Sequence, residues 1–194
     1  MEIYLIRHGI TEWNKERRLQ GNSDTPLANE GIELAKEASE RLKDIYFDRI
    51  YSSPLKRAYD TAVILRGNRD IPIITDERIR EIGFGVCEGM NFDELVKDEK
   101  GPFKYFFDEP GKYFAPEGGE SLKEVCNRAA SFWKEVILPL DGICKRIMIV
   151  AHGAVNKAQM CFIENRGTDK YWDGGLQHNC EAVIIRYSDG KFIL

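Results

Sequence analysis

Long hydrophobic runs, paired cysteines and an excess of one charge are all missing from this sequence. No apolar segment is long enough to span a bilayer, and the apolar run near the amino terminus is too short for a signal peptide. The five cysteines are odd in number, scattered and never spaced as CxxC, which argues against a disulfide framework or a zinc site. These absences predict a cytoplasmic protein with reduced thiols and no membrane partner.

A basic composition is lacking too, because the formal net charge is -4. This balance argues against a general nucleic-acid or membrane-surface binder, although it permits a local basic pocket. Of the 194 residues, 43% are hydrophobic and 31% are charged, which is typical of an ordinary globular protein. We expect a single domain over residues 1–194, in which residues 91–119 form an excursion.

Two short apolar runs each lead into a histidine followed by a glycine. Residues 3–6 precede Arg7-His8-Gly9, and residues 147–151 precede His152-Gly153. Unbroken apolar runs of this kind are typical of buried parallel strands. Ligands collect at the carboxyl ends of the strands in open α/β sheets, so both imidazoles should lie at one edge. Each glycine would let backbone N–H groups approach a ligand closely.

The remaining pattern alternates strands with amphipathic helices. A long polar loop should span residues 10–26, and loops of that length are often functional. We expect strands at 48–53, 71–74, 182–187 and 191–194. The 71–74 strand should lie at an edge of the sheet because it contains a proline. We expect helices over 29–45, 122–138 and 155–164. Ser121 and Glu124 have the spacing of a capping box. This alternation predicts a three-layer α/β domain with a mostly parallel central sheet.

A further helix should begin at Ser53-Pro54, with the serine as N-cap and the proline at the first helical position. Lys56 and Arg57 would then lie in the first turn, where the helix dipole disfavours cations. An anion bound there would reverse that penalty. Taken alone, the two residues fit a solvated surface pair better.

Glu81 and Glu88 are candidate acids in a turn-rich segment that precedes an aromatic one. Glu81 could instead form a salt bridge with Arg78 or Arg80. Seven aromatic residues lie between Asn91 and Gly119. They could form a lid with an aromatic specificity surface, or a satellite core, which suits most of the rings better.

The candidate residues together suit a dianionic phosphate. A metal site is the main competitor for histidines, but Arg7 would repel a cation, and HExxH spacing is absent. A phosphate monoester repels a nucleophile until guanidinium groups neutralise its oxygens through charge-assisted hydrogen bonds. The same cations favour a neutral His8, which leaves one ring nitrogen with a free lone pair.

The sequence resembles the histidine phosphatase superfamily, which includes cofactor-dependent phosphoglycerate mutases and phosphatases similar to them. The resemblance runs in order over nearly the whole chain and rests on four motifs. These are Leu5-Ile6-Arg7-His8-Gly9 with Thr11, Trp13, Asn14 and Gln20-Gly21; Ser52-Ser53-Pro54-Leu55-Lys56-Arg57-Ala58; Glu81 seven residues before Glu88-Gly89; and Val150-Ala151-His152-Gly153. A lone RHG triplet would be weak, but four motifs in order are specific.

The resemblance implies a three-layer α/β/α sandwich and a ping-pong reaction that needs no metal or other cofactor. His8 would attack phosphorus to give a phosphohistidine, while Glu81 protonates the leaving alcohol and then activates water. Arg7, Arg57 and a charged His152 would hold the phosphoryl group of a small phosphate ester. The other substrate-binding residues implied are Asn14, Gln20, Gly21 and Gly153. Asn14 and Gln20 could alternatively be turn residues that cap the loop.

Three activities remain open within this resemblance. Mutases of the family carry a longer insertion and a C-terminal tail that closes over the site. This chain has a shorter middle segment and stops at a strand-like end. The difference favours a phosphatase of small phosphate monoesters over a phosphoglycerate mutase. A catalytically silent interaction module is disfavoured, because a scaffold has no need for a cluster of like charges. Where the family more often places a polar residue this chain has Ile10, which could narrow the range of leaving groups or make the pocket rim apolar. We expect Trp13, Trp133 and Trp172 to serve packing, and His178 to lie in a turn.

Overall fold

A six-stranded mixed sheet forms the centre of the computed structural model, which describes residues 1–194. The strands are β1 (Glu2–Arg7), β2 (Arg49–Ser52), β3 (Ile73–Thr75), β4 (Arg146–Ala151), β5 (Ala182–Ser188) and β6 (Lys191–Ile193). Their order is β3-β2-β4-β1-β5-β6, so β3 lies at an edge as the proline predicted. The pairs β1–β4, β2–β4 and β2–β3 are parallel, and β5 and β6 are antiparallel to their neighbours. The sheet is thus mostly parallel.

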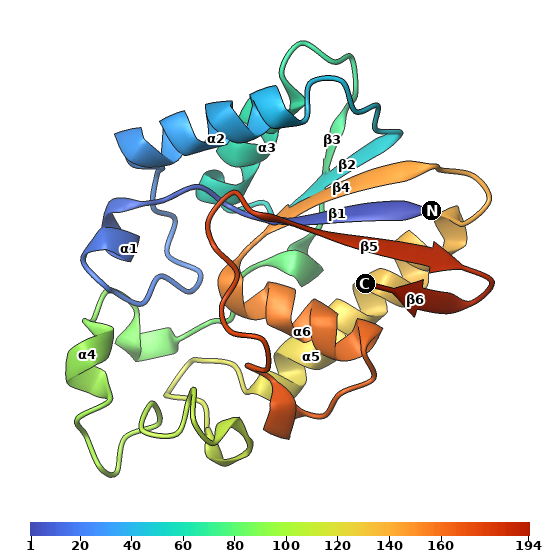
Figure 1. Ribbon diagram of the computed structural model, residues 1–194. Helices are drawn as coiled ribbons and strands as arrows, with labels where there is room; N and C mark the ends of the chain where they lie inside the picture. Colours follow the sequence, from blue (N-terminus) through green and yellow to red (C-terminus); the bar gives the residue numbers. More distant parts are fainter.

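Helices cover both faces of this sheet (Figure 1). On one side lie α2 (Asn29–Arg41) and α3 (Lys56–Arg66), and on the other lie α5 (Leu122–Phe132) and α6 (Gly153–Ile163). Side chains of β1 alternate between the two layers, since Ile3 and Leu5 join one buried cluster and Tyr4 and Ile6 join the other. The expected three-layer α/β/α architecture is confirmed. None of the helices is both long enough and apolar enough to cross a membrane.

Helix boundaries follow the sequence signals at some ends and depart from them at others. Ser121 and Glu124 form the expected capping box, and α5 then continues through a π-helical turn at Trp133–Ile137 and a 3₁₀ turn at Leu138–Leu140. The prediction that Ser53 caps α3 is wrong, because that helix begins at Lys56 with Leu55 at the N-cap position. The Ser53 hydroxyl is instead directed toward His152.

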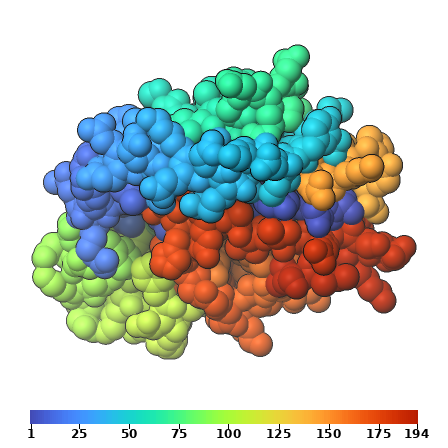
Figure 2. Space-filling view, turned by 45° about the horizontal axis from the view of Figure 1, so that its top comes forward, coloured from blue at the N-terminus to red at the C-terminus, as the bar shows by residue number.

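The loop 10–26 and the segment 91–119 lie side by side, as Figure 2 shows on one face of the molecule. The loop contains the short helix α1 (Glu12–Lys15), which is capped by Thr11. The segment contains α4 (Phe92–Leu95) and a 3₁₀ turn at Pro110–Lys112, and is otherwise made of turns. The backbone N–H of Phe92 donates to the Arg17 carbonyl at 2.8 Å, which joins the two.

Candidate active site

The two His-Gly pairs meet at the carboxyl ends of the adjacent strands β1 and β4. In their parallel register Arg7 lies opposite Ala151, so His8 and His152 follow at the same level. The two rings are buried, with centroids 5.1 Å apart. The expectation that both imidazoles lie at one edge is therefore confirmed.

Hydrogen bonding fixes which His8 nitrogen is free. Nδ1 of His8 lies 2.6 Å from the Gly9 carbonyl oxygen, and because a carbonyl can only accept, Nδ1 must carry the proton. Nε2 then keeps its lone pair. Burial, followed by the charges of Arg57 and Arg7, holds the pKa of His8 well below its ordinary value. The ring is therefore neutral at neutral pH, with a free lone pair on Nε2.

His152 lies beside His8 and has one unsatisfied nitrogen. Its Nε2 is 2.7 Å from the Ser53 hydroxyl oxygen, whereas its Nδ1 is buried and has no partner. Burial, then the Arg57 charge, holds the pKa of His152 well below its ordinary value, so the ring is neutral in the free protein. A bound dianion would oppose both effects and favour the protonated ring.

Arg57 is fully buried, in contrast to the surface pair that its sequence context favoured. Its Nη1 donates to the Ser23 carbonyl at 2.8 Å and its Nη2 to the Gly21 carbonyl at 2.7 Å, while Nε has no partner. Burial lowers the pKa of Arg57 to about 10, which still leaves the group charged at neutral pH. The surface interpretation holds only for Lys56, which is exposed and pairs with Asp60 at 2.8 Å.

Arg7 is held from the opposite side of the cleft. Its Nη1 donates to the Gln177 carbonyl at 2.7 Å, and its Nε is buried without a partner. The Gln177 side chain accepts from Asn156 Nδ2 at 2.8 Å and donates to the Leu5 carbonyl at 2.9 Å. Burial lowers the pKa of Arg7, although the nearby charge of Glu81 opposes this effect. Two guanidinium groups thus flank His8, each with a donor unused by the protein.

Glu81 reaches the cleft from the segment after β3, and its carboxylate lies at the N-terminus of α6. Oε1 accepts from the backbone N–H groups of Ile82 and Val155, both at 3.0 Å, and Oε2 accepts from that of Ala154 at 3.2 Å. The alternative salt bridges are not formed, since Arg78 pairs with Asp76 and Glu135, and Arg80 pairs with Glu77.

Glu88 does not line the cleft. Its Oε1 accepts from the backbone N–H groups of Asn22 and Phe84, and its Oε2 accepts from the backbone N–H and hydroxyl of Ser23. The prediction that it is a candidate acid is therefore wrong, because its carboxylate is occupied in joining the loop to the segment around Phe84. Of the two glutamates, only Glu81 is placed to meet a ligand.

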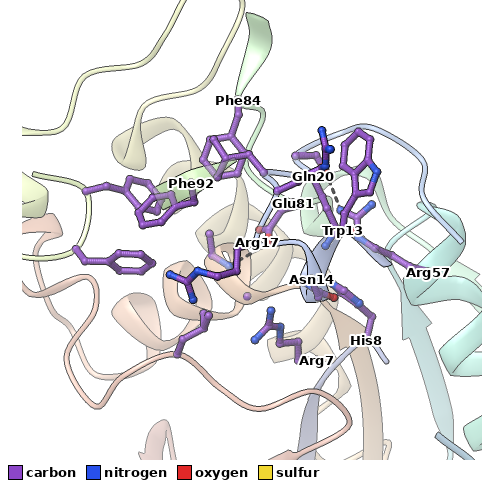
Figure 3. Close-up of a pocket in the computed structure, with 18 of the residues that line it drawn as sticks. Arg7, His8, Trp13, Asn14, Arg17, Gln20, Arg57, Glu81, Phe84 and Phe92 are labelled. Atoms are coloured by element: carbon purple, nitrogen blue, oxygen red, sulfur yellow. Dashed lines mark hydrogen bonds between the residues drawn. The ribbon is translucent and has the colours of Figure 1, made fainter. Parts of the chain in front are cut away.

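The four expected substrate contacts all line one cleft of about 260 Å³, part of which Figure 3 shows. Asn14 Oδ1 accepts from the Thr11 backbone, and Gln20 Oε1 accepts from the hydroxyls of Thr11 and Thr25. Both residues therefore cap the loop, which was the alternative to substrate binding. Their amide nitrogens nevertheless donate to no protein group and remain available to a ligand.

Glycine is required at the two remaining positions. Gly21 has φ +54, and a Cβ there would meet the Glu88 carboxylate at 2.1 Å. A Cβ on Gly153 would lie 2.9 Å from Leu176 and 3.6 Å from Nε of Arg7. Backbone at these positions can thus approach a ligand in a way that a side chain would prevent.

An aromatic wall and two further arginines, Arg17 and Arg18, complete the cleft. We define the aromatic wall as five rings that line the cleft, of which Phe84 and Phe92 lie away from His8 in Figure 3. The five rings are Phe84, Phe92, Phe106, Phe107 and Trp172. Phe106 also belongs to the buried core, so the rings of this segment are divided between the cleft and the core.

Three expectations about individual side chains need correction. Trp13 and Trp172 line the cleft rather than serving packing alone, whereas Ile10 does not line it. Arg17 and Arg18 also line the cleft. Their place in a polar loop of unusual length was the only signal that could have indicated them. The structure contains no cluster of three or more His, Cys, Asp or Glu side chains arranged to hold a metal ion.

Comparisons with known proteins agree with this geometry. The chain matches the sequence model of the histidine phosphatase superfamily (branch 1) over residues 3–194. It is 33% identical to phosphoserine phosphatase 1 of Hydrogenobacter thermophilus, over 95% of this chain and 86% of that one. It is 35% identical to the probable phosphoglycerate mutase GpmB of Salmonella choleraesuis, over 100% of this chain and 88% of that one.

Solved structures of similar proteins have the same fold. YhfR of Bacillus stearothermophilus superposes with a TM-score of 0.90 at 36% identity, over 100% of this chain and 94% of that one. A phosphoserine phosphatase of Entamoeba histolytica, solved in complex with phosphoserine, superposes with a TM-score of 0.84 at 30% identity, over 99% and 93% of the two chains. The chain therefore belongs to the histidine phosphatase superfamily, branch 1.

Proposed function

We propose that this protein is a metal-independent phosphatase that hydrolyses small-molecule phosphate monoesters through a phosphohistidine on His8. The observation that carries the proposal is the free Nε2 lone pair of a neutral, buried His8 between two guanidinium groups. Similarity to phosphoserine phosphatases supports the reaction class. We further propose a cytoplasmic location, because nothing in the cysteine pattern calls for an oxidising compartment.

In the first half-reaction, Nε2 of His8 attacks phosphorus and the bond from phosphorus to the ester oxygen breaks. Glu81 gives its proton to the departing alkoxide, so the products are an alcohol and a phosphohistidine. Arg7 and Arg57 would bind the equatorial oxygens through the donors that the protein leaves free. Asn14, Gln20 and the backbone at Gly21 and Gly153 would complete the phosphate site.

In the second half-reaction, water attacks the phosphohistidine and the bond from phosphorus to nitrogen breaks. Glu81, now ionised, takes a proton from the water, and inorganic phosphate leaves. His152 would carry a proton while the dianion is bound, since its unpartnered Nδ1 can then donate to a phosphoryl oxygen. The enzyme returns to its starting protonation state.

The aromatic wall supports a substrate with apolar or ring character. Flat rings bury apolar surface at low conformational cost, and they line the same cleft as His8, so they would contact the organic part of a phosphate ester bound there. An equal rate with aryl and sugar phosphates of matched leaving groups would contradict this part of the proposal.

The test is a steady-state assay with an activated aryl phosphate in the presence of chelator. Wild type should turn over, and His8→Ala should lose at least about a thousandfold in kcat because the nucleophile is gone. His178→Ala is the matched control, since His178 is exposed and outside the cleft. Rapid quenching in base should trap a labelled phosphohistidine in wild type and in His178→Ala, but not in His8→Ala.

Two results would overturn the proposal. Chelator-sensitive turnover, or turnover that survives in His8→Ala, would exclude a metal-free phosphohistidine route. Transfer of the phosphoryl group between the hydroxyls of phosphoglycerate, faster than its release as inorganic phosphate, would favour the mutase alternative instead. The similarity to GpmB makes this second assay necessary.

A further inference from the structure

The backbone that carries Glu81 has no regular secondary structure of its own. Residues 80–83 follow the 3₁₀ turn Glu77–Ile79 and belong to neither a helix nor a strand. No backbone N–H donates to the carbonyl oxygens of Arg78, Arg80 or Glu81. An acid in the proposed reaction must nevertheless lie within hydrogen-bond distance of the leaving oxygen. Groups other than the backbone must therefore hold this segment in place.

The side chain of Arg128, which lies on α5, supplies the missing hydrogen bonds. Its Nη1 donates to the Arg78 carbonyl at 2.8 Å and to the Arg80 carbonyl at 2.6 Å. Its Nη2 donates to the carbonyl of Glu81 itself at 2.9 Å. The Arg128 side chain is only 18% exposed, so water competes little for these contacts. One guanidinium group thus satisfies three carbonyls that the backbone leaves free.

Glu120 holds the Arg128 guanidinium in place. Its Oε1 accepts from Nε of Arg128 at 2.8 Å, and its Oε2 accepts from Nη2 at 2.9 Å. Glu120 also contacts the segment directly, because Oε2 accepts from the Gly83 N–H at 2.8 Å and the Glu120 N–H donates to the Gly83 carbonyl at 2.8 Å. Together the two side chains fix the backbone from residue 78 to residue 83.

Arg128 has no donor left for a ligand. A guanidinium group has five N–H donors, and here two bind Glu120 and three bind backbone carbonyls. Arg128 also does not line the cleft. A lysine would keep the charge, but its three donors and compact ammonium group could not reproduce this set of contacts.

The position of this backbone matters because the Glu81 side chain lies in the cleft together with His8 (Figure 3). Its carboxylate accepts from the N–H groups of Ala154 and Val155 at 3.2 and 3.0 Å. Helix α6 therefore holds the carboxylate, whereas Arg128 on α5 holds the backbone of the same residue. Loss of either support would let the carboxylate move.

We propose that Arg128 is a positioning residue for Glu81, which fixes the backbone of the acid so that its carboxylate reaches the leaving oxygen. The inference rests on the proposed function, because it takes Glu81 as the group that protonates the departing alkoxide. Arg128 itself would transfer no proton and contact no substrate. Glu120 would contribute by orienting the guanidinium.

The experiment compares two aryl phosphates that differ in their need for a proton. Dinitrophenolate leaves without protonation, whereas loss of the more basic phenolate from phenyl phosphate is assisted by an acid. Arg128→Lys should lower kcat/KM for phenyl phosphate by about a hundredfold, the loss expected when a catalytic group is displaced by about 1 Å. For 2,4-dinitrophenyl phosphate, kcat/KM should change by less than about threefold. A purely structural loss would lower both values by the same factor.

Arg69→Lys is the matched control. Arg69 is also a partly buried arginine whose guanidinium donates to three backbone carbonyls, those of Leu42, Leu65 and Arg66. It neither lines the cleft nor contacts the segment that carries Glu81. The substitution should leave the ratio of the two kcat/KM values unchanged.

Glu81→Gln sets the scale of the effect, because it removes the acid outright. Arg128→Lys in this background should cause no further loss with phenyl phosphate, since the group through which it acts is absent. Glu120→Gln provides a second measurement if Arg128→Lys does not fold. It keeps Arg128 but weakens the contact that orients it, so it should lower kcat/KM for phenyl phosphate selectively.

Equal losses with both substrates, or a further loss in the Glu81→Gln background, would overturn the positioning role. A crystal structure of Arg128→Lys separates the placement of Glu81 from turnover. The Glu81 carboxylate should lie beyond hydrogen-bond distance of the N–H groups of Ala154 and Val155, and this result supports the role even where the proposed phosphatase reaction fails. A carboxylate that keeps both contacts overturns it even where that reaction is confirmed.

Discussion

His8 and His152 differ from exposed histidines in that folding makes their protonation harder. Both rings are buried beside Arg57, and the only polar partner of His8 Nδ1 is a carbonyl oxygen. Arg57 and Arg7 remain charged because their ordinary pKa values lie far above neutrality. The result is a pair of neutral imidazoles between permanent cations, which is an arrangement suited to receiving a dianion.

Stability should therefore fall as the pH drops below about 6.5. The unfolded histidines titrate near the ordinary value of 6.5, whereas the folded ones titrate well below it, so acid favours the unfolded chain, which binds more protons. Each histidine should remove up to about 1.4 kcal/mol of unfolding free energy per pH unit. Urea unfolding at about pH 6.5 and about pH 5.5 measures this loss of unfolding free energy. Both pH values lie above the range in which most carboxylates titrate, so carboxylates contribute little to the difference.

A variant comparison isolates the cause of that pH dependence. His152→Asn should reduce the slope of unfolding free energy against pH, because one of the two shifted groups is removed. His178→Gln should leave the slope unchanged, since His178 is exposed. An unchanged slope in His152→Asn would show that other groups cause the acid sensitivity.

At the scale of elements, α6 connects the core to the candidate site through a line of buried polar side chains. Trp133 Nε1 donates to Gln159 Oε1 at 3.0 Å, and Gln159 Nε2 donates to Asn156 Oδ1 at 3.1 Å. Asn156 Nδ2 then donates to the side-chain oxygen of Gln177, and the backbone carbonyl of Gln177 accepts from Arg7. Because every link is fully or partly buried, loss of one leaves its neighbours unsatisfied.

Asn156→Leu should lower kcat/KM by about tenfold, because Arg7 loses the support that orients it toward the phosphoryl group. It should also cost about 1–3 kcal/mol of stability. In an Arg7→Gln background the same substitution should have no further effect on kcat/KM, since the group through which it acts is already absent.

Ile163→Ala is the control for a purely structural loss. Ile163 is a buried residue of the same helix with no link to Arg7, so the substitution should destabilise the fold and leave kcat/KM intact. Additive effects of Asn156→Leu and Arg7→Gln on kcat/KM would contradict a positioning role for Asn156.

At the scale of the whole molecule, residues 91–119 join the main core although they also border the cleft. Phe103, Phe106 and Tyr113 belong to the larger buried cluster, together with residues of β1, β4 and α5. Trp172, from the segment between α6 and β5, packs on Phe106 and Phe107. We propose that residues 1–194 unfold as one domain, with residues 91–119 as a specificity insertion.

Phe103→Ala should lower the free energy of unfolding by about 3–5 kcal/mol, because it removes a fully buried ring from the shared core. Circular dichroism and tryptophan fluorescence should report the same urea transition. Phe114→Ala, which truncates a ring that is 53% exposed, should have little effect. Separate transitions would mean that the segment folds independently of the sheet.

The sequence alone predicted much of the fold, because its signals are local. Apolar runs marked the strands, a three-to-four residue period marked the helices, and Ser121 with Glu124 marked a helix start. From the rule that ligands gather at the carboxyl ends of parallel strands, His8 and His152 could be predicted to lie together. This prediction requires only that the two strands are parallel and lie at the same edge, and β1 and β4 are parallel neighbours.

Only the tertiary structure decided how residues distant in the chain would pair. Arg57 is buried because the loop carbonyls of Gly21 and Ser23 reach it. Glu81 rather than Glu88 meets the cleft because α6 presents its first N–H groups there. Which aromatic rings and arginines line the cleft likewise depends on how residues 91–119 pack against the loop 10–26. Such contacts join segments tens of residues apart, and no local pattern of hydrophobicity or propensity encodes which of them will form.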